Sequence, residues 1–294
     1  MYLQNLIKTF QLYPFPQQVK LAKFYIQRKI KGKNLVSPSF FNDFIRLNSY
    51  LQSGVSISNI DEGRFRFKYS INGKETVSYL RKDNSDLDVF TGVVLWHEYK
   101  ALHEHFLPQH EPIKYIVDAG GNVGLSALYL KRYFTNAKIA VVEPDKETFD
   151  ILVINTQAND EKDIEAFHNA LWTHNGEVSL ATDYADGRSW SNSIKEQTIT
   201  SSSTLKGITL DSLIQAASFP YIDIFKIDVE GAEFTLFNDQ GFLNIINSKV
   251  RSMIIEIHDN GKLKDGIHTK MMDMGFAYKD CSSVAFYYKT AFAK

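Results

Sequence analysis

A glycine-rich loop follows a short apolar run near the middle of the chain. The run Tyr115–Val117 leads into Asp118, Ala119, Gly120, Gly121, Asn122, Val123 and Gly124. Glycine lets a backbone turn sharply and approach a ligand closely, because it has no Cβ atom. In open α/β sheets, ligands bind beside loops at the carboxyl ends of strands. The loop therefore predicts a ligand site.

An acidic residue stands at the end of the next apolar run. Lys138–Val142 is followed by Glu143 and Pro144, roughly 20 residues after the loop. A carboxylate in this place can accept hydrogen bonds from both hydroxyls of a ribose. The ligand is therefore expected to carry an adenosine-type ribose.

The loop departs from the dinucleotide fingerprint Gly-x-Gly-x-x-Gly. Ala119 occupies the first glycine position, ahead of Gly121 and Gly124. Asp118 would repel a pyrophosphate, but it would attract an α-amino group or a sulfonium. A Tyr-x-x-x-Lys pair, as in a short-chain reductase, does not occur downstream of the loop. These residues favour S-adenosylmethionine over NAD(P) as the cofactor.

Acid–base residues follow two later apolar runs. Asp228 and Glu230 come after Ile222–Ile227, and His258 comes after Ser252–Ile257. A methyl acceptor with a hydroxyl group benefits from a general base within about 2.6–3.2 Å of its proton. Imidazole has an ordinary pKa near 6.5, whereas the carboxylates lie beside the expected sulfonium. The residues leave Asp228, Glu230 and His258 as alternative catalytic bases.

The same strand ends could supply oxygen ligands to Mg²⁺. The donors would be Asp228, Glu230, Glu256 and His258. Their spacing matches no metal motif, and carboxylates at strand ends also arise for other reasons. We therefore expect no resident metal.

The elements that must position these residues alternate between strands and helices. Nearly continuous apolar runs are typical of strands covered on both faces, and a helix is expected between the first two, over 123–134. This pattern predicts a Rossmann-like, doubly wound α/β fold with a mostly parallel sheet. Residues 276–278 and 284–288 predict an antiparallel hairpin at one sheet edge.

The N-terminal third has a different pattern. A helix is expected over 17–31, and a β-hairpin over 64–80 turns at Asn72-Gly73. We therefore expect an N-terminal α+β extension, residues 1–110, that caps the active site of a catalytic domain, residues 111–294. The insertion at about 183–205, with Tyr184, Arg188, Trp190 and Asn192, is expected to help shape the acceptor pocket.

Composition indicates a globular protein. Of 294 residues, 44% are hydrophobic and one is cysteine, which excludes a disulfide framework and a cysteine-based zinc cluster. The chain has no run of 18 apolar residues and no secretory signal pattern, so a cytoplasmic location is expected. No nucleic-acid-binding motif is present, and we expect no nucleic-acid partner.

Charge is unevenly distributed along the chain. Residues 1–40 contain seven of the 33 basic residues and none of the 34 acidic ones, which leaves a net charge of −8 on the remainder. Such an arm could contact an anionic membrane, at the inner membrane surface, or a lipid-linked substrate. The alternative is a solvated helix whose apolar residues dock on the main domain. Charge runs usually lie on solvated faces, which favours the alternative.

Three segments resemble the FkbM-type family of S-adenosylmethionine-dependent methyltransferases. Residues 117–124 look like the family's first motif, and Glu143-Pro144 like its ribose-binding motif. The octapeptide 226–233, Lys-Ile-Asp-Val-Glu-Gly-Ala-Glu, is similar to its most specific motif. Residues 80–99 are similar to a segment that precedes the domain. The resemblance covers about residues 80–260.

The resemblance implies a seven-stranded sheet and methyl transfer to a hydroxyl of a sugar, a glycan precursor or another small molecule. Alternatives are an NAD(P)-dependent oxidoreductase and a non-catalytic protein that binds S-adenosylmethionine. The resemblance also implies that Asp86 and Tyr99 close the pocket. Carried over to this sequence, the cofactor-binding residues are Asp118, Gly120, Asn122, Gly124, Glu143, Pro144, Asn169 and Asp228.

Overall fold

The chain divides into two compact units, residues 1–95 and 96–294. Sequence patterns place the division at residue 110, whereas the structure divides ahead of a short helix over 100–106. That the N-terminal part caps the active site stays a prediction. The structure is a computed structural model that describes residues 2–31, 39–61, 63–82, 84–109, 112–179, 204–258, 262–281 and 283–290.

The N-terminal unit is an α+β arrangement, as the sequence predicts. Its antiparallel sheet has the strand order β1-β2-β3, and the predicted hairpin turns at Asn72 and Gly73, both with positive φ. Aromatic rings such as Phe67 and Phe90, whose centroids are 4.9 Å apart, fill its core. Its elements are α1 (Tyr2–Gln11), α2 (Phe15–Lys31), α3 (Ser39–Gln52), β1 (Ser56–Asn59), β2 (Arg64–Ile71), β3 (Lys74–Arg81), α4 (Asp86–Phe90) and a π-helical turn (Thr91–Leu95).

The second unit contains a seven-stranded sheet in the order β12-β13-β11-β10-β4-β5-β6. Strands β6, β5, β4, β10 and β11 are parallel, and β13 runs antiparallel to both of its neighbours. The predicted sheet and its edge hairpin are confirmed. The strands are β4 (Tyr115–Ala119), β5 (Lys138–Val142), β6 (Ile164–Phe167), β10 (Ile224–Ile227), β11 (Ser252–Glu256), β12 (Ala277–Cys281) and β13 (Val284–Tyr288).

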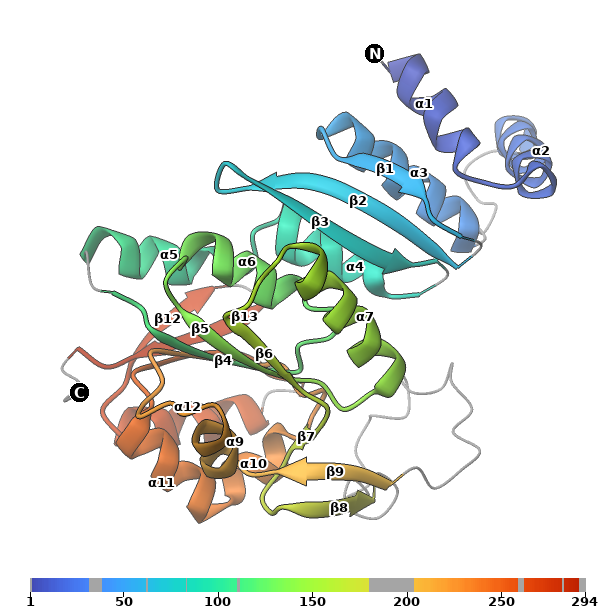
Figure 1. Cartoon of the computed structure of the whole chain (residues 1–294). Helices are drawn as coiled ribbons and strands as arrows, with labels where there is room; N and C mark the ends of the chain where they lie inside the picture. The colour runs from blue at the N-terminus through green and yellow to red at the C-terminus, as the bar shows by residue number, and fades with distance from the viewer. Residues whose placement is uncertain are drawn as a thin grey trace. The chain divides into compact units, whose positions relative to one another are not determined.

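Helices cover both faces of this sheet, which explains why its central strands are almost wholly apolar (Figure 1). Several helices begin at a side-chain cap; for example, Asp145 accepts from the Thr148 amide at 2.8 Å. One face carries α5 (Lys100–Phe106), α6 (Leu125–Tyr133) and α7 (Lys146–Ala158). The other carries α9 (Leu210–Ala216), α10 (Glu233–Asn238), α11 (Gln240–Lys249) and α12 (Lys262–Asp273).

A small sheet in the order β7-β9-β8 was not predicted from the sequence. Strand β7 has two residues, too few for a hydrophobic period to be visible. The predicted acceptor-shaping residues of 184–192 lie outside the described residues. The strands are β7 (Ala170–Leu171), β8 (Gly176–Ser179) and β9 (Thr204–Ile208).

The order in which the strands are connected identifies the edge of the sheet beside β4 as a switch point. From β4 the chain proceeds to β5 and β6 on one side, and it then returns to β10 on the other side of β4. Ligands of open α/β sheets bind at such a switch point, outside the carboxyl ends of the strands. The glycine loop follows β4, and Asp228 follows β10, so both lie at this edge.

Candidate functional site

The glycine loop lies against the backbone of the segment that follows β10. Gly120 has φ +75°, and a Cβ atom built there would stand 1.7 Å from the carbonyl oxygen of Asp228. Its amide donates to the Val142 carbonyl at 3.0 Å, which ties the loop to β5. The loop thus lies between two strand ends, and its close approach to the Asp228 backbone requires glycine.

A buried ion pair lies beneath the loop. Asp118 and Lys226 are partners in the β4–β10 register, and Lys226 Nζ stands 3.1 Å from Asp118 Oδ1. Asp118 Oδ2 accepts from Ser126 Oγ at 2.6 Å, and Lys226 Nζ donates to the Gly120 carbonyl at 2.6 Å. Both charged side chains are at most 2% exposed. In this structure Asp118 contacts protein groups, and its direct contact with a cofactor stays a prediction.

Lys226 is the first functional residue that sequence reasoning missed. Burial by itself lowers the pKa of a lysine, but the carboxylates of Asp118 and Asp228 outweigh it and hold the pKa well above its ordinary value. Lys226 Nζ stands 3.5 Å from Asp228 Oδ2. A permanent cation therefore joins the glycine loop to the candidate base. The octapeptide motif contains this lysine, but nothing local shows its partners.

Glu143 clamps the glycine loop to the end of β5. Its Oε2 accepts from the Asn122 amide and its Oε1 from the Asp145 amide, both at 2.9 Å. Burial raises the pKa of Glu143 to about 7. Each carboxylate oxygen can accept a second hydrogen bond, so both remain able to receive a ribose hydroxyl. The structure thus fixes the Glu143 carboxylate at the switch edge, and its contact with a ribose stays a prediction.

The remaining predicted cofactor residues follow three neighbouring strands, β4, β5 and β6. Gly124 has φ +83° and forms the N-cap of α6. The Pro144 carbonyl is 3.0 Å from His168 Nε2. Asn169 follows β6, and its side-chain amide donates to the Lys206 carbonyl at 3.1 Å. Their predicted contacts with methionine, ribose and adenine stay predictions.

Acidic side chains surround His258 at the ends of β10 and β11. His258 Nε2 is 3.8 Å from Asp228 Oδ1, 3.7 Å from Glu230 Oε2 and 3.8 Å from Glu256 Oε1. The structure thus brings together all three predicted catalytic residues. Glu230 does not cap α10, and its side chain is 73% exposed, whereas that of Asp228 is 24% exposed.

Glu233 is the second residue that sequence reasoning missed. It is fully buried, and its Oε1 stands 3.0 Å from His258 Nδ1. A carboxylate that holds one ring nitrogen fixes the orientation of an imidazole and leaves the other nitrogen for chemistry. Glu233 therefore positions His258 so that Nε2 faces the cluster. Acidic residues are common in the first turn of a helix, so nothing in the sequence around Glu233 indicates a contact with His258.

The pKa values of the side chains around His258 indicate which of them carry a proton near neutral pH. The hydrogen bond with Glu233 raises the pKa of His258 to about 9, so the imidazolium form prevails at neutral pH. Burial, and then the charge of Asp228, raises the pKa of Glu256 to about 7. Burial also raises the pKa of the nearby Tyr99 hydroxyl well above its ordinary value. A protonated His258 donates to carboxylates and does not accept a proton.

We expect thermal stability to fall as pH rises from 6.5 to 9. The folded protein holds the His258 proton more tightly than the unfolded chain, so this stabilisation is complete below the ordinary pKa near 6.5 and is lost as pH passes about 9. Differential scanning fluorimetry across this range measures the slope. His258→Gln should flatten it, and the exposed His174→Gln should not; equal slopes in all three proteins would refute the His258–Glu233 assignment.

A divalent cation could be held by part of the cluster. Asp228, Glu230 and His258 offer ligand atoms that all lie within 4.8 Å of one another. Carboxylate oxygens suit Mg²⁺ and Mn²⁺, whereas an imidazole nitrogen suits Zn²⁺ or Fe²⁺. The same atoms also form a network in which protonated His258 takes the place of a cation. The expectation of no resident metal stays a prediction.

Asp86, which the resemblance implies closes the pocket, has a structural contact in this structure. It is fully buried in the N-terminal unit, where it accepts from the Arg81 amide at 2.8 Å and pairs with the Arg81 guanidinium.

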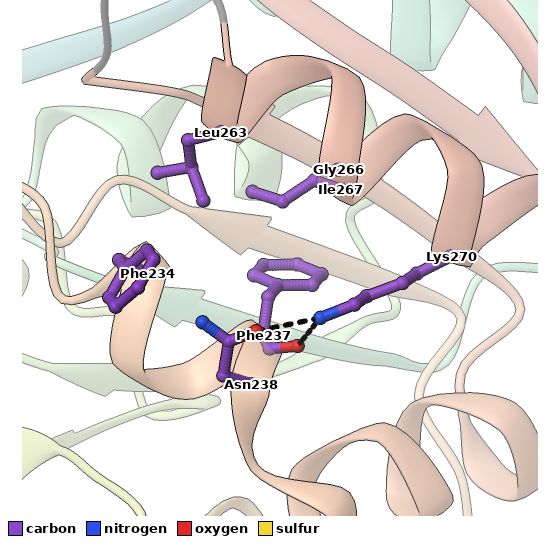
Figure 2. A pocket seen from close by; sticks show the side chains of 7 residues that line it. All are labelled: Phe234, Phe237, Asn238, Leu263, Gly266, Ile267 and Lys270. Carbon is purple, nitrogen blue, oxygen red and sulfur yellow. Dashed lines mark hydrogen bonds between the residues drawn. The ribbon is translucent and has the colours of Figure 1, made fainter.

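Figure 2 shows a small hollow between α10 and α12, where Lys270 Nζ donates to the Phe237 carbonyl at 2.7 Å and caps the end of α10. Phe234, Phe237, Asn238, Leu263, Gly266, Ile267 and Lys270 line it, without a carboxylate or imidazole.

Comparison with known proteins gives a consistent family signal. The family described as "Methyltransferase FkbM domain" matches residues 118–278 of the chain. The hexuronic acid methyltransferase AglP of Haloferax volcanii is 28% identical over 148 residues, which cover 50% of this chain and 57% of that protein. The methyltransferase sdnD of Sordaria araneosa is 27% identical over 193 residues, 55% of this chain and 73% of that protein. Methyltransferase 1 of Beauveria bassiana is 24% identical over 186 residues, which cover 55% of this chain and 72% of that protein.

Proposed function

Because this chain belongs to the FkbM methyltransferase family, we propose that it transfers a methyl group from S-adenosylmethionine to a hydroxyl group of a sugar or glycan precursor. The observation that carries the proposal is the carboxylate cluster directly beside the glycine loop, where Asp228 contacts the loop through its backbone. A sulfonium placed at this edge meets carboxylates, and an acceptor hydroxyl meets a base. The relative that is named for hexuronic acid supports a sugar acceptor.

Methyl transfer is a displacement at carbon, so acceptor oxygen, methyl carbon and sulfur must lie in line. The C–S bond breaks, its electron pair stays on sulfur, and the new O–C bond forms as the hydroxyl proton leaves. We assign that proton to Asp228, whose partly exposed carboxylate lies between Lys226 and His258. The two cations fix the carboxylate without blocking it from solvent. Positioning of the two reactants supplies much of the acceleration.

The family match favours methyl transfer over hydride transfer to or from a nicotinamide. Isothermal titration with S-adenosylhomocysteine, NAD⁺ and NADP⁺ separates these functions. Binding of the homocysteine compound alone is the expected result, followed by transfer of labelled methyl to uronic acids or neutral sugars. Assays with and without EDTA should give equal rates. A preference for a dinucleotide would contradict the proposal, and binding without any transfer would favour the non-catalytic alternative.

Removal of the Glu143 carboxylate should abolish measurable binding of S-adenosylhomocysteine. Glu143→Ala deletes the expected ribose acceptor and also releases the Asn122 and Asp145 amides. Glu143→Gln should weaken binding less, because it keeps one acceptor oxygen. The matched control is Glu165→Ala, an exposed carboxylate on β6. Titration calorimetry measures all three; unchanged affinity of the alanine variant would refute the ribose assignment.

A further inference from the structure

Helix α2 of the N-terminal unit has two apolar faces, of which one is satisfied within that unit. Leu21 is 1% exposed and Phe24 is 8% exposed. The Phe24 ring packs on Phe41 of α3, with centroids 4.6 Å apart. These residues account for the attachment of α2 to its own unit.

The opposite face of α2 is apolar and exposed. At about 100° per residue, its members fall within an arc of about 80°, on the far side of the helix from Leu21 and Phe24. The stripe extends over roughly 22 Å of helix length at 1.5 Å per residue. It consists of Phe15, Val19, Ala22, Ile26 and Ile30, and the four larger side chains are 76%, 51%, 58% and 77% exposed.

Soluble proteins rarely expose a continuous apolar stripe that has no binding role. Here lysines border the stripe: Lys23 lies along one side and Lys29 along the other, and both are exposed. No acidic residue occurs before Asp43. The face is therefore apolar in the middle and cationic at its margins, which is the composition of a helix that lies in a membrane interface.

We propose that α2 docks this face on a lipid bilayer that is rich in anionic lipid. The stripe is a convex row of short aliphatic side chains and one phenyl ring, which can enter the acyl boundary while the lysines meet lipid phosphates. No helix among the described residues is long and apolar enough to cross a membrane, so α2 would lie parallel to the surface. An anionic bilayer complements the charge of the whole arm, which has seven cations and no acid in residues 1–40.

The test is co-flotation of the full chain with vesicles, in the absence of methyl donor. Vesicles of phosphatidylglycerol and phosphatidylcholine should carry the protein upward, and vesicles of phosphatidylcholine alone should carry much less. Raising salt from about 0.15 M to about 1 M, which shortens the Debye length from about 8 Å to about 3 Å, should reduce the bound fraction. Because no methyl transfer is measured, the result is independent of the proposed function.

Matched variants locate the contact. Ile26→Asn together with Ile30→Asn should lower the vesicle partition coefficient at least about 100-fold, the lower end of the effect expected from losing two buried aliphatic side chains. Lys23→Gln with Lys29→Gln should remove much of the preference for anionic lipid. The control is Ile45→Asn, an isoleucine on α3 that is 49% exposed and lies in the same unit. Circular dichroism and thermal melts verify that each variant is folded.

Two results would overturn the proposal. One is failure of the wild-type protein to float with anionic vesicles. The other is equal flotation of the wild type and the Ile26/Ile30 variant, which would place the contact elsewhere. Sedimentation velocity should show the same mass for both proteins; a dimer that the isoleucine substitutions dissociate would assign the stripe to a second copy of the chain and refute membrane docking.

Discussion

Asp228→Asn should lower kcat by at least about 100-fold, the usual lower bound for the loss of a general base. Asparagine keeps the shape of the side chain, but it cannot take up the hydroxyl proton. It also leaves Lys226 and His258 with one carboxylate fewer between them. Asp228 is also a predicted cofactor residue, but S-adenosylhomocysteine is a neutral thioether without the sulfonium charge that this carboxylate would attract. Its affinity should therefore change by no more than a few-fold. Labelled-methyl transfer and titration calorimetry measure the two quantities.

Glu230→Gln is the matched control, because it neutralises a carboxylate of the same cluster whose side chain is 73% exposed. We expect a much smaller loss of kcat from this variant. An equal loss from Glu230→Gln, with Asp228→Asn nearly active, would transfer the role of base to Glu230.

The pH dependence of kcat tests whether Glu256, the other carboxylate close to His258, is the general base. Glu256, with a pKa near 7, would impose a rise in rate as pH passes that value if it accepted the proton. Under the Asp228 assignment, Glu256→Gln keeps most of the activity. Loss of activity in Glu256→Gln, together with a wild-type rise near pH 7, would refute the Asp228 assignment.

The sequence predicts those features that depend on neighbouring residues. The glycine loop, Glu143 and the apolar strands are recognisable because a turn, a strand end and a buried strand each leave a local pattern. The hairpin at Asn72-Gly73 is confirmed for the same reason, because these residues accept the positive φ of a tight turn.

The contacts missed from the sequence join distant segments. Lys226 meets Asp118 because β10 lies beside β4 in register, a strand order that composition does not encode. Glu233 meets His258 because β10 and β11 are parallel neighbours, which brings together residues 25 positions apart. A lysine within an apolar strand and a glutamate at a helix start look ordinary until the sheet is assembled. The catalytic alternatives could therefore be named from sequence, but the groups that position them could not.

A marked loss of cofactor binding is also expected from a single methyl group added to the glycine loop. Gly120→Ala places a Cβ atom 1.7 Å from the Asp228 carbonyl oxygen, at a φ of +75° that alanine rarely adopts. Neither strand end can move away easily, because the Gly120 amide is bonded to Val142 and its carbonyl to Lys226. The loop must shift, so affinity for S-adenosylhomocysteine should fall at least about tenfold, or 1.4 kcal/mol.

Gly266→Ala separates this effect from the general cost of replacing glycine. A Cβ atom at Gly266 in α12 would meet nothing within 4 Å, and alanine is favoured over glycine inside a helix by about 1 kcal/mol. This control should bind the ligand normally and melt at the wild-type temperature or slightly above it. Affinity of Gly120→Ala is to be measured on protein shown to be folded by near-ultraviolet circular dichroism. If the folded variant binds with wild-type affinity, cofactor binding does not depend on the close approach of this loop to Asp228. The assignment of the cofactor site to the β4–β10 switch point is then wrong.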